Sequence, residues 1–235
     1  MKKLEVKSLI KNYGKIPALK GLSFSADGEI FGLVGPNGAG KTTTLNIISG
    51  IILPDAGEFF VSEINGIKEK IKAKKLIGYL PEEPFFFDYL TGEETLNFVS
   101  SAYKIEWEKD DLLKKWMEDL QLMPYLKNMV GNYSHGMRQK LAIALSIFHN
   151  PEVILWDEPF IGLDWPSQEK LKEIMKELKN KGKTLILSTH HLELVEEVCD
   201  RAAFILDGKI VWEGEDTEKL KELFYDYLKE EPLGN

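Results

Sequence analysis

The sequence has a single cysteine, Cys199, among its 235 residues. One cysteine cannot close a disulfide within the chain and cannot build a zinc site, so the sequence indicates a reducing compartment. Cys199 ends the segment HLELVEEVC, whose pattern is helical, and a buried, unreactive thiol is expected there.

Long hydrophobic runs are also missing. The apolar stretch at 141–148 is eight residues long, whereas a membrane span needs about 18 or more. The N-terminus turns polar again at Lys7, too early for the apolar region of a signal peptide. We therefore expect a soluble, cytoplasmic chain that reaches a membrane only through a partner.

Positive charge is in the minority, and arginine is nearly absent. The chain has 30 basic and 38 acidic residues, a net charge of −8, which argues against a protein whose whole surface grips nucleic acid or anionic lipid. Arg138 and Arg201 are the only arginines. Little chemistry in this protein can therefore depend on arginine.

What the chain does have is 43% hydrophobic residues, enough for a core, in alternating strand and helix patterns. The ranges with strand character are 3–9, 22–25, 30–35, 58–63, 76–80, 153–157 and 184–189, with a turn at Asp27-Gly28 and a hairpin over 202–214. The run at 30–35 is continuously apolar, which is typical of a strand buried on both faces of a parallel sheet, and buried strands are also expected at 153–157 and 184–189. Helices are expected after residue 40 up to Gly50, from Pro166 onward, and over the last twenty residues until Pro232.

The pattern between about 84 and 150 is helical. Thr91 followed by Glu94 predicts a capping box for a helix through about 103, and further helices are expected over 108–120 and 136–148. The sequence thus predicts one α/β domain over 1–235. Its α/β core comprises 1–83 and 151–235, and a helical subdomain, 84–150, is inserted into that core.

A glycine-rich loop, GPNGAGKT at 35–42, matches the pattern G-x-x-x-x-G-K-[ST] between a predicted strand and a predicted helix. Glycines let backbone N–H groups turn toward phosphate oxygens, and the helix N-terminus adds the positive end of its dipole. Lys41 is expected to reach the β- and γ-phosphates, and the Thr42 hydroxyl to hold Mg²⁺. The nucleotide-binding residues expected here are Gly35, Pro36, Asn37, Gly38, Ala39, Gly40, Lys41, Thr42 and Thr43.

Two acids, Asp157 and Glu158, stand at the end of the predicted strand at 153–157. Ligands of open α/β sheets bind at the carboxyl ends of the strands, so Asp157 suits the magnesium shell and Glu158 suits a base that orients or deprotonates water. His190 ends the strand at 184–189 and should lie at the same edge, near the γ-phosphate or the attacking water. His191 is expected to be exposed or to cap the next helix.

Together these motifs resemble the ATP-binding domain of ABC transporters, from Tyr13 to about Asp200. The resemblance implies a P-loop NTPase core with an N-terminal antiparallel β subdomain and an inserted helical subdomain, and an enzyme that hydrolyses ATP with Mg²⁺. It further implies these roles: Tyr13 stacks on adenine, 35–42 is the Walker A loop, Asp157 and Glu158 are the Walker B aspartate and catalytic glutamate, His190 is the H-switch, and 161–164 is the D-loop with its acid Asp164. For Tyr13, a purely packing role is the alternative.

Two motifs depart from the family pattern. The signature, usually LSGGQ, reads YSHGM at 133–137 and keeps Ser134 and Gly136, which the resemblance assigns to contact with a γ-phosphate. The Q-loop glutamine is replaced by Glu82, which adds negative charge near Mg²⁺ and is expected to coordinate it. Signatures and Q-loops of this form are similar to those of a branch dominated by bacterial and archaeal exporters.

The resemblance also implies the partners. The signature of one protomer completes the Walker A site of another, so a head-to-tail dimer, homomeric or heteromeric, is expected on the cytoplasmic face of the membrane with a separate permease and no nucleic acid. Residues 85–87 and Tyr89 follow the Q-loop, where the family receives a helix of the permease; core positions are the alternative for each of these aromatic residues. Lys41, Mg²⁺, His190 and the partner's helix N-terminus, instead of an arginine, are expected to stabilise the charge on the transferring phosphate.

A second interpretation is a soluble ABC ATPase that works in cofactor assembly or regulation without transport. A repair-type ATPase would need a long coiled-coil insertion, and a translation-type one usually carries two such domains; neither pattern occurs in this sequence. A GTPase would show the guanine motif N-K-x-D, which the sequence lacks. The transporter ATPase therefore remains the leading interpretation.

Overall fold

The computed structural model describes residues 2–230. Its strands are β1 (Leu4–Tyr13), β2 (Ile16–Ala26), β3 (Ile30–Val34), β4 (Ala56–Val61), β5 (Ile64–Asn65), β6 (Ile77–Leu80), β7 (Val153–Asp157), β8 (Thr184–Thr189), β9 (Arg201–Leu206) and β10 (Lys209–Gly214). Its helices are α1 (Lys41–Ile48), α2 (Lys70–Lys75), α3 (Gly92–Tyr103), α4 (Asp111–Asp119), α5 (His135–Ile147), α6 (Trp165–Asn180), α7 (Leu192–Val198) and α8 (Thr217–Glu230). Within these residues, no helix combines the length and hydrophobicity that a membrane crossing needs.

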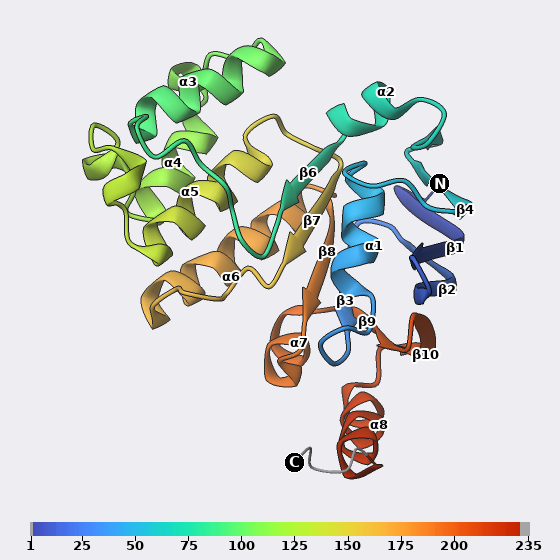
Figure 1. Ribbon diagram of the computed structural model, residues 1–235. Coiled ribbons are helices and arrows are strands. Elements are labelled where there is room, and N and C mark those ends of the chain that lie inside the picture. The colour runs from blue at the N-terminus through green and yellow to red at the C-terminus, as the bar shows by residue number, and fades with distance from the viewer. Residues whose placement is uncertain (1, 231–235) are drawn as a thin grey trace.

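Two sheets organise the protein (Figure 1). A six-stranded sheet has the order β10-β9-β3-β8-β7-β6, in which only the edge strand β10 pairs antiparallel. A four-stranded antiparallel sheet has the order β2-β1-β4-β5. This mixed α/β architecture confirms the predicted fold class.

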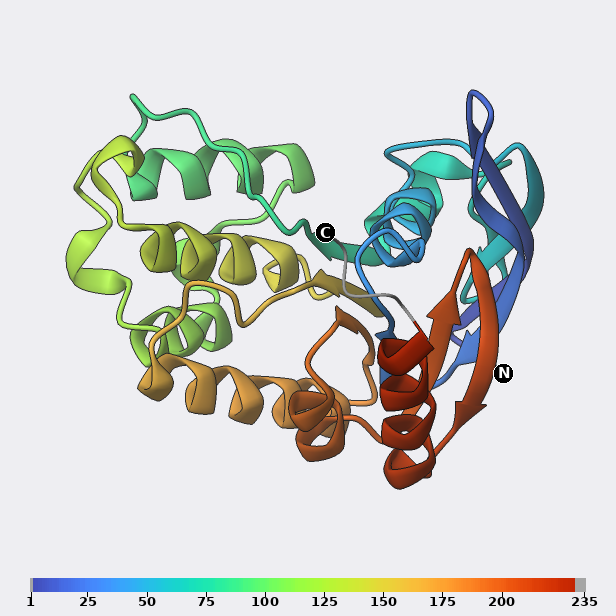
Figure 2. The same cartoon turned by 60° about the horizontal axis from the view of Figure 1, so that its bottom comes forward.

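The parallel strands are buried on both faces, which explains their continuous apolar runs. In β7, Val153 and Leu155 pack into a core shared with α1 and the antiparallel sheet. Ile154 and Trp156 point the other way, into a core shared with α3 to α6. Both Figure 1 and Figure 2 show those helices on one side of the parallel sheet and the antiparallel sheet on the other.

The helices α3, α4 and α5 follow one another between β6 and β7. The capping box that begins α3 is present: the Glu94 amide donates to the Thr91 hydroxyl at 3.1 Å, and the Thr91 amide donates to the Glu94 carboxylate at 2.8 Å. The helix expected over 108–120 begins later, at Asp111, because the Asp110 side chain accepts from two backbone N–H groups and caps it there.

Two sequence expectations need correction, and a third cannot be compared with the structure. β1 and β2 are longer than the segments expected at 3–9 and 22–25, because the register shifts along this pair interrupt the alternation of apolar residues. Cys199 is not inside a helix, since α7 ends at Val198; it is partly exposed, although burial of the thiol raises its pKa. Pro232, expected to stop the last helix, lies outside the described residues.

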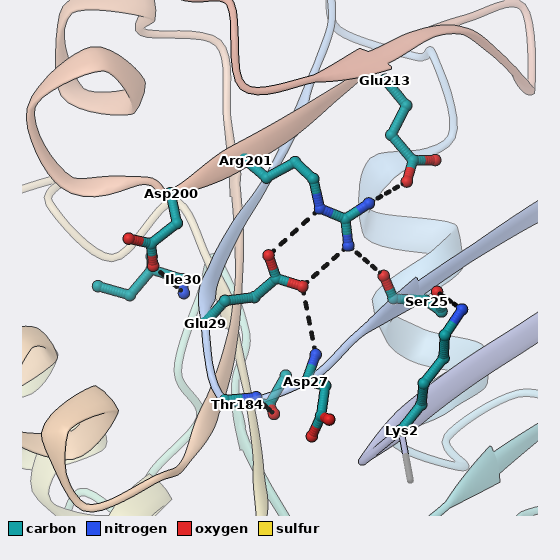
Figure 3. A network of polar contacts seen from close by, with 10 residues as sticks. Lys2, Ser25, Asp27, Glu29, Ile30, Thr184, Asp200, Arg201 and Glu213 are labelled. Atoms are coloured by element: carbon teal, nitrogen blue, oxygen red, sulfur yellow. Dashed lines mark hydrogen bonds and ion pairs between the residues drawn. The ribbon is translucent and has the colours of Figure 1, made fainter.

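Arg201 makes a network of polar contacts at the amino ends of the parallel strands (Figure 3). Its guanidinium makes two hydrogen bonds to the Glu29 carboxylate, at 2.8 and 3.2 Å, and also pairs with Glu213 on β10. Arg201 begins β9 and Glu29 precedes β3, so both lie at the amino ends of parallel strands. The loop at 35–42 follows the carboxyl end of β3, about 17 Å away along the strand. Arg201 is therefore a structural residue that cannot act on its own glycine-rich loop.

Candidate active site

The glycine-rich loop joins β3 to α1 and depends on its glycines. Gly38 and Gly40 have φ angles of 80° and 109°, in the left-handed region that side chains disfavour. A Cβ on Gly35 would lie 2.3 Å from the carbonyl oxygen of Ile205, so no side chain fits there. The backbone can therefore curl over the start of α1 only with glycine at these positions.

Lys41 is buried at the start of α1. Its Nζ donates to the carbonyl oxygens of Gly35, at 2.7 Å, and Pro36, at 3.0 Å, and so spans the mouth of the loop. Burial lowers the pKa of Lys41, while the carboxylates of Glu158 and Asp157 act against that shift. A negatively charged ligand in the loop would favour the ammonium form.

A pocket of about 270 Å³ opens over this loop at the carboxyl ends of the parallel strands. Its lining residues are Asn37, Gly38, Gly40, Lys41, Thr42, Thr43, Glu82, Asp157, Glu158 and His190. Most of the residues that the sequence assigned to phosphate, metal and catalysis thus meet in one place. Gly35, Pro36 and Ala39 shape the loop without lining the pocket.

Asp157 ends β7 and is buried. Its Oδ1 accepts a hydrogen bond from the Ser188 hydroxyl on the neighbouring strand β8, whereas its Oδ2 is buried without a hydrogen-bond partner. Burial raises the pKa of Asp157, and hydrogen bonds from Ser188 and Thr42 act against that shift. An unpartnered carboxylate oxygen beside the Thr42 hydroxyl is the hard oxygen donor set that Mg²⁺ takes.

Glu158 is the next residue and is only 6% exposed. Its Oε2 accepts from the Thr189 hydroxyl at 3.0 Å, and its Oε1 accepts from the His190 backbone N–H at 3.1 Å. The Nδ1 atom of His190 lies 2.6 Å from the same Oε1, a distance that requires a proton between them. The side chain of Glu158 is therefore held in one orientation by the end of β8.

Sequence reasoning missed the two hydroxyl residues Ser188 and Thr189. Both stand at the end of β8, directly before His190, and each donates to one of the two acids at the end of β7, Ser188 to Asp157 and Thr189 to Glu158. The register pairs Asp157 with Ser188, which sets these contacts. Their signal was available, because polar residues that end an otherwise apolar strand point to the ligand edge of the sheet.

Glu82 reaches the same pocket from the loop after β6. Partial burial raises its pKa, and the charges of Asp157 and Glu158 add to that shift. Three carboxylates therefore face one lysine around the pocket, an arrangement that a divalent cation would stabilise.

Three expected nucleotide contacts lie away from the pocket. Tyr13 is 49% exposed at the end of β1. Ser134 is the N-cap of α5, where its hydroxyl accepts from the Met137 N–H at 3.3 Å. Gly136 faces the D-loop so closely that a Cβ there would lie 2.6 Å from the carbonyl oxygen of Gly162. Within this chain, the signature residues thus contact the D-loop and not the glycine-rich loop.

The aromatic residues after Glu82 divide into two groups. Phe86 is buried in the core, whereas Phe85, Phe87 and Tyr89 are exposed by 83%, 41% and 70%. The exposed rings contact one another, with Phe87 between the other two at centroid distances of 5.8 Å. His191, beside His190, is exposed as expected, but its side chain does not cap α7.

Comparison with known proteins extends this picture to the whole chain. The protein-family model described as "ABC transporter" matches residues 19–161 of this chain. A second, described as "AAA domain, putative AbiEii toxin, Type IV TA system", matches residues 129–196.

Among curated relatives, the linearmycin resistance ATP-binding protein LnrL of Bacillus subtilis is 36% identical, over 96% of this chain and 73% of LnrL. The fluoroquinolones export ATP-binding protein of Mycobacterium tuberculosis is also 36% identical, over 88% of this chain and 69% of that protein.

Solved structures agree with the sequence relatives. The ATP-binding subunit of an ABC transporter superposes with a TM-score of 0.87 at 30% identity, over 96% of this chain and 97% of the other. A dimeric post-hydrolysis state of the ATP-binding cassette MJ0796, bound to ADP and Pi, superposes with a TM-score of 0.81 at 26% identity, over 90% and 98%. The chain belongs to the ABC transporter family and is an ATP-binding, ATP-hydrolysing subunit of the kind that powers such a transporter.

Proposed function

We propose that this protein hydrolyses MgATP in a head-to-tail dimer and couples that cycle to a separate membrane permease that exports its substrate. The observation that carries the proposal is the pocket over the glycine-rich loop, where Lys41, Asp157, Glu158 and His190 converge. Each of these side chains has a distinct chemical task in phosphoryl transfer.

Magnesium fits the residues present. Asp157, whose Oδ2 has no hydrogen-bond partner, lines the pocket together with Thr42, and Glu82 offers a further carboxylate. When bound, the cation neutralises charge on the phosphates. We assign Thr42, Asp157 and Glu82 as the residues that hold it.

Catalysis falls to Glu158 with His190. Oε1 of Glu158 already accepts two hydrogen bonds from His190, whereas Oε2 accepts one, from Thr189, and keeps a free lone pair. We assign this oxygen to the water that attacks the γ-phosphate, with Glu158 as general base and His190 as the residue that positions it. Lys41 and the amides of the loop stabilise charge on the transferring phosphate.

The position of the signature residues supports a head-to-tail dimer. Ser134 and Gly136 lie at the N-terminus of α5, outside the pocket of their own chain. A helix N-terminus favours phosphate, and we therefore assign these residues to the site of a second subunit. The related cassette bound to ADP and Pi is dimeric, which supports this arrangement, as a homodimer or with a related subunit.

The permease is assigned to the exposed ring cluster after Glu82, formed by Phe85, Phe87 and Tyr89. Exposed aromatic clusters mark surfaces that bind another protein. A relative named for fluoroquinolones export and another named for linearmycin resistance favour export as the direction. We accordingly place the protein at the cytoplasmic face of the membrane.

The decisive test replaces Glu158 by Gln. This variant should bind MgATP normally, lose ATP hydrolysis by about a thousand-fold or more because the base is gone, and accumulate as an ATP-bound dimer in size-exclusion chromatography. The matched control is Glu193→Gln, a change of the same kind at an exposed residue on α7, which should hydrolyse ATP at the normal rate. Normal hydrolysis by Glu158→Gln would remove Glu158 as the base.

A further inference from the structure

A short segment of this acidic protein, residues 68–75, is rich in positive charge. Residues 68–75 carry five lysines and one glutamate, although the whole chain has a net charge of −8. Lys68, Lys72, Lys74 and Lys75 are exposed, and only Lys72 pairs with the glutamate, Glu69, at 2.6 Å. The resulting surface on α2 is therefore strongly basic.

This basic surface borders a groove. Lys74 and Lys75 on α2 and Lys104 at the end of α3 line a pocket of about 430 Å³ together with Ile71 and Tyr103. Ile71 is 77% exposed. Figure 1 shows α2 and α3 along the same upper edge of the molecule. We call the groove lined by these five residues the basic groove.

The combination points to a ligand with an anionic head and an apolar body. Lysine side chains lie along apolar surface while their ammonium groups reach charge at its border, and tyrosine suits the interface between apolar and aqueous surroundings. We propose that the basic groove binds anionic phospholipid at the membrane surface and so orients the ATPase there.

Charge favours lipid over an acidic protein segment. The cytoplasmic leaflet carries anionic lipid, whereas cytoplasmic segments of membrane proteins have an excess of lysine and arginine. A basic groove would repel such segments and attract the lipid around them.

The position of α3 supports the same assignment. Phe98, in the middle of α3, packs on Phe87 with a centroid distance of 5.9 Å. The middle of α3 thus contacts the ring cluster assigned to the permease, and its C-terminal end borders the basic groove. The placement beside the permease rests on the proposed function; the lipid binding itself does not.

The test is flotation of the purified full chain with vesicles. The protein should float with vesicles that contain phosphatidylglycerol, but not with pure phosphatidylcholine, and its binding should weaken as the salt concentration rises. Lys74→Gln, Lys75→Gln and Lys104→Gln combined should lower the partition coefficient by about a hundred-fold, because each lysine near the surface contributes to binding.

The matched control removes the same charge elsewhere. Lys20, Lys176 and Lys209 are exposed on β2, α6 and β10, and their combined replacement by Gln should leave vesicle binding nearly intact. An equal loss in both triple variants, or no binding to phosphatidylglycerol, would overturn the proposal. Binding to a polyglutamate peptide but not to the vesicles would assign the groove to an acidic protein segment. The vesicles hold no permease and no ATP turnover is measured, so failure here is separate from failure of the proposed function.

Discussion

At the scale of single residues, the site is defined by acids that are costly to keep charged. Asp157 has a buried oxygen without a partner, and Glu82 shares its pocket with two further carboxylates. Burial raises the pKa of both side chains. The free protein is therefore arranged for a cation and a phosphate chain, and it gains stability when they bind.

Replacing Asp157 by Asn should stabilise the ligand-free protein while removing its response to Mg²⁺. The pKa of Asp157 is raised in the folded state, so its ionised form costs free energy once the pH exceeds 3.8, the ordinary pKa of aspartate. That cost grows as the pH rises through the folded pKa and stays at its full value above it. At pH 7 we expect the free energy of unfolding of the variant to exceed that of the wild type by about 1 kcal/mol, which raises its Tm by roughly 2–4 °C.

Thermal unfolding without nucleotide, measured between pH 4 and pH 7, checks this expectation. The difference between variant and wild type should be small at the acid end and should widen toward neutral pH. A variant that is less stable than the wild type at pH 7 would show that Asp157 is stabilised by its hydrogen bonds more than burial destabilises it.

Replacing Glu82 by Gln tests the metal assignment of the Q-loop residue. Removing a carboxylate ligand should raise the Mg²⁺ concentration needed for half-maximal hydrolysis by about ten-fold. Maximal turnover should be recovered at saturating Mg²⁺. Glu83→Gln is the matched control, since Glu83 is exposed and does not line the pocket. An unchanged Mg²⁺ titration in Glu82→Gln would exclude direct coordination by Glu82.

At the scale of elements, the N-terminus of α5 connects two motifs. Gly136 approaches the D-loop carbonyl of Gly162, and a Cβ on Gly162 would in turn lie 2.1 Å from the His135 ring. The signature and the D-loop therefore pack as one unit, and glycine is needed on both sides of the contact. The capping hydroxyl of Ser134 fixes where α5 begins.

Gly136→Asp should stop ATP turnover and leave ATP binding by the monomer unchanged. The new side chain displaces the D-loop and places negative charge where a phosphate of the second subunit is expected, whereas Lys41 and the glycine-rich loop are untouched. Equilibrium binding of a fluorescent ATP analogue and steady-state hydrolysis separate the two effects. Loss of binding in the monomer would contradict an action on the partner's site.

At the scale of the whole molecule, the pocket over the glycine-rich loop and the signature residues lie apart within one chain. A homodimer would contain two composite sites, each built from both chains. Mixing Glu158→Gln with Gly136→Asp should therefore restore activity, because one site of the mixed dimer takes its glutamate and its signature from unaltered halves.

In an equal mixture with random pairing, about a quarter of all sites are intact, so about a quarter of the wild-type hydrolysis rate is expected. Each variant alone stays inactive and provides the control. No recovery on mixing, with dimers present, would show that the signature acts within its own chain or that the partner is a different subunit.

The net charge of the chain does not describe how charge is distributed over its surface. The value of −8 argued against a surface that grips lipid everywhere, and it says nothing about distribution. The fold gathers Lys74 and Lys75 of α2 and Lys104, directly after α3, around one groove. A local basic surface can thus exist on an acidic protein.

Several features could be predicted from the sequence because they depend on local chemistry. The glycine-rich loop, the apolar run that ends in Asp157 and Glu158, and the capping box at Thr91 each combine a local pattern with a local requirement for φ angles, burial or hydrogen bonds. Continuous apolar runs likewise indicated strands buried on both faces. The lengths of β1 and β2 could not be predicted, because register shifts interrupt their pattern.

The sequence by itself determined the fold class, the phosphate loop and the identity of the two acids and His190, since these follow from residue types at fixed spacing. Only the tertiary structure decided that Ser188 and Thr189 hold those acids, that Phe86 is buried while its neighbours are exposed, and that α2 and α3 share a groove. The reason is that strand register and helix packing set contacts between residues far apart in the chain, and no local pattern encodes them.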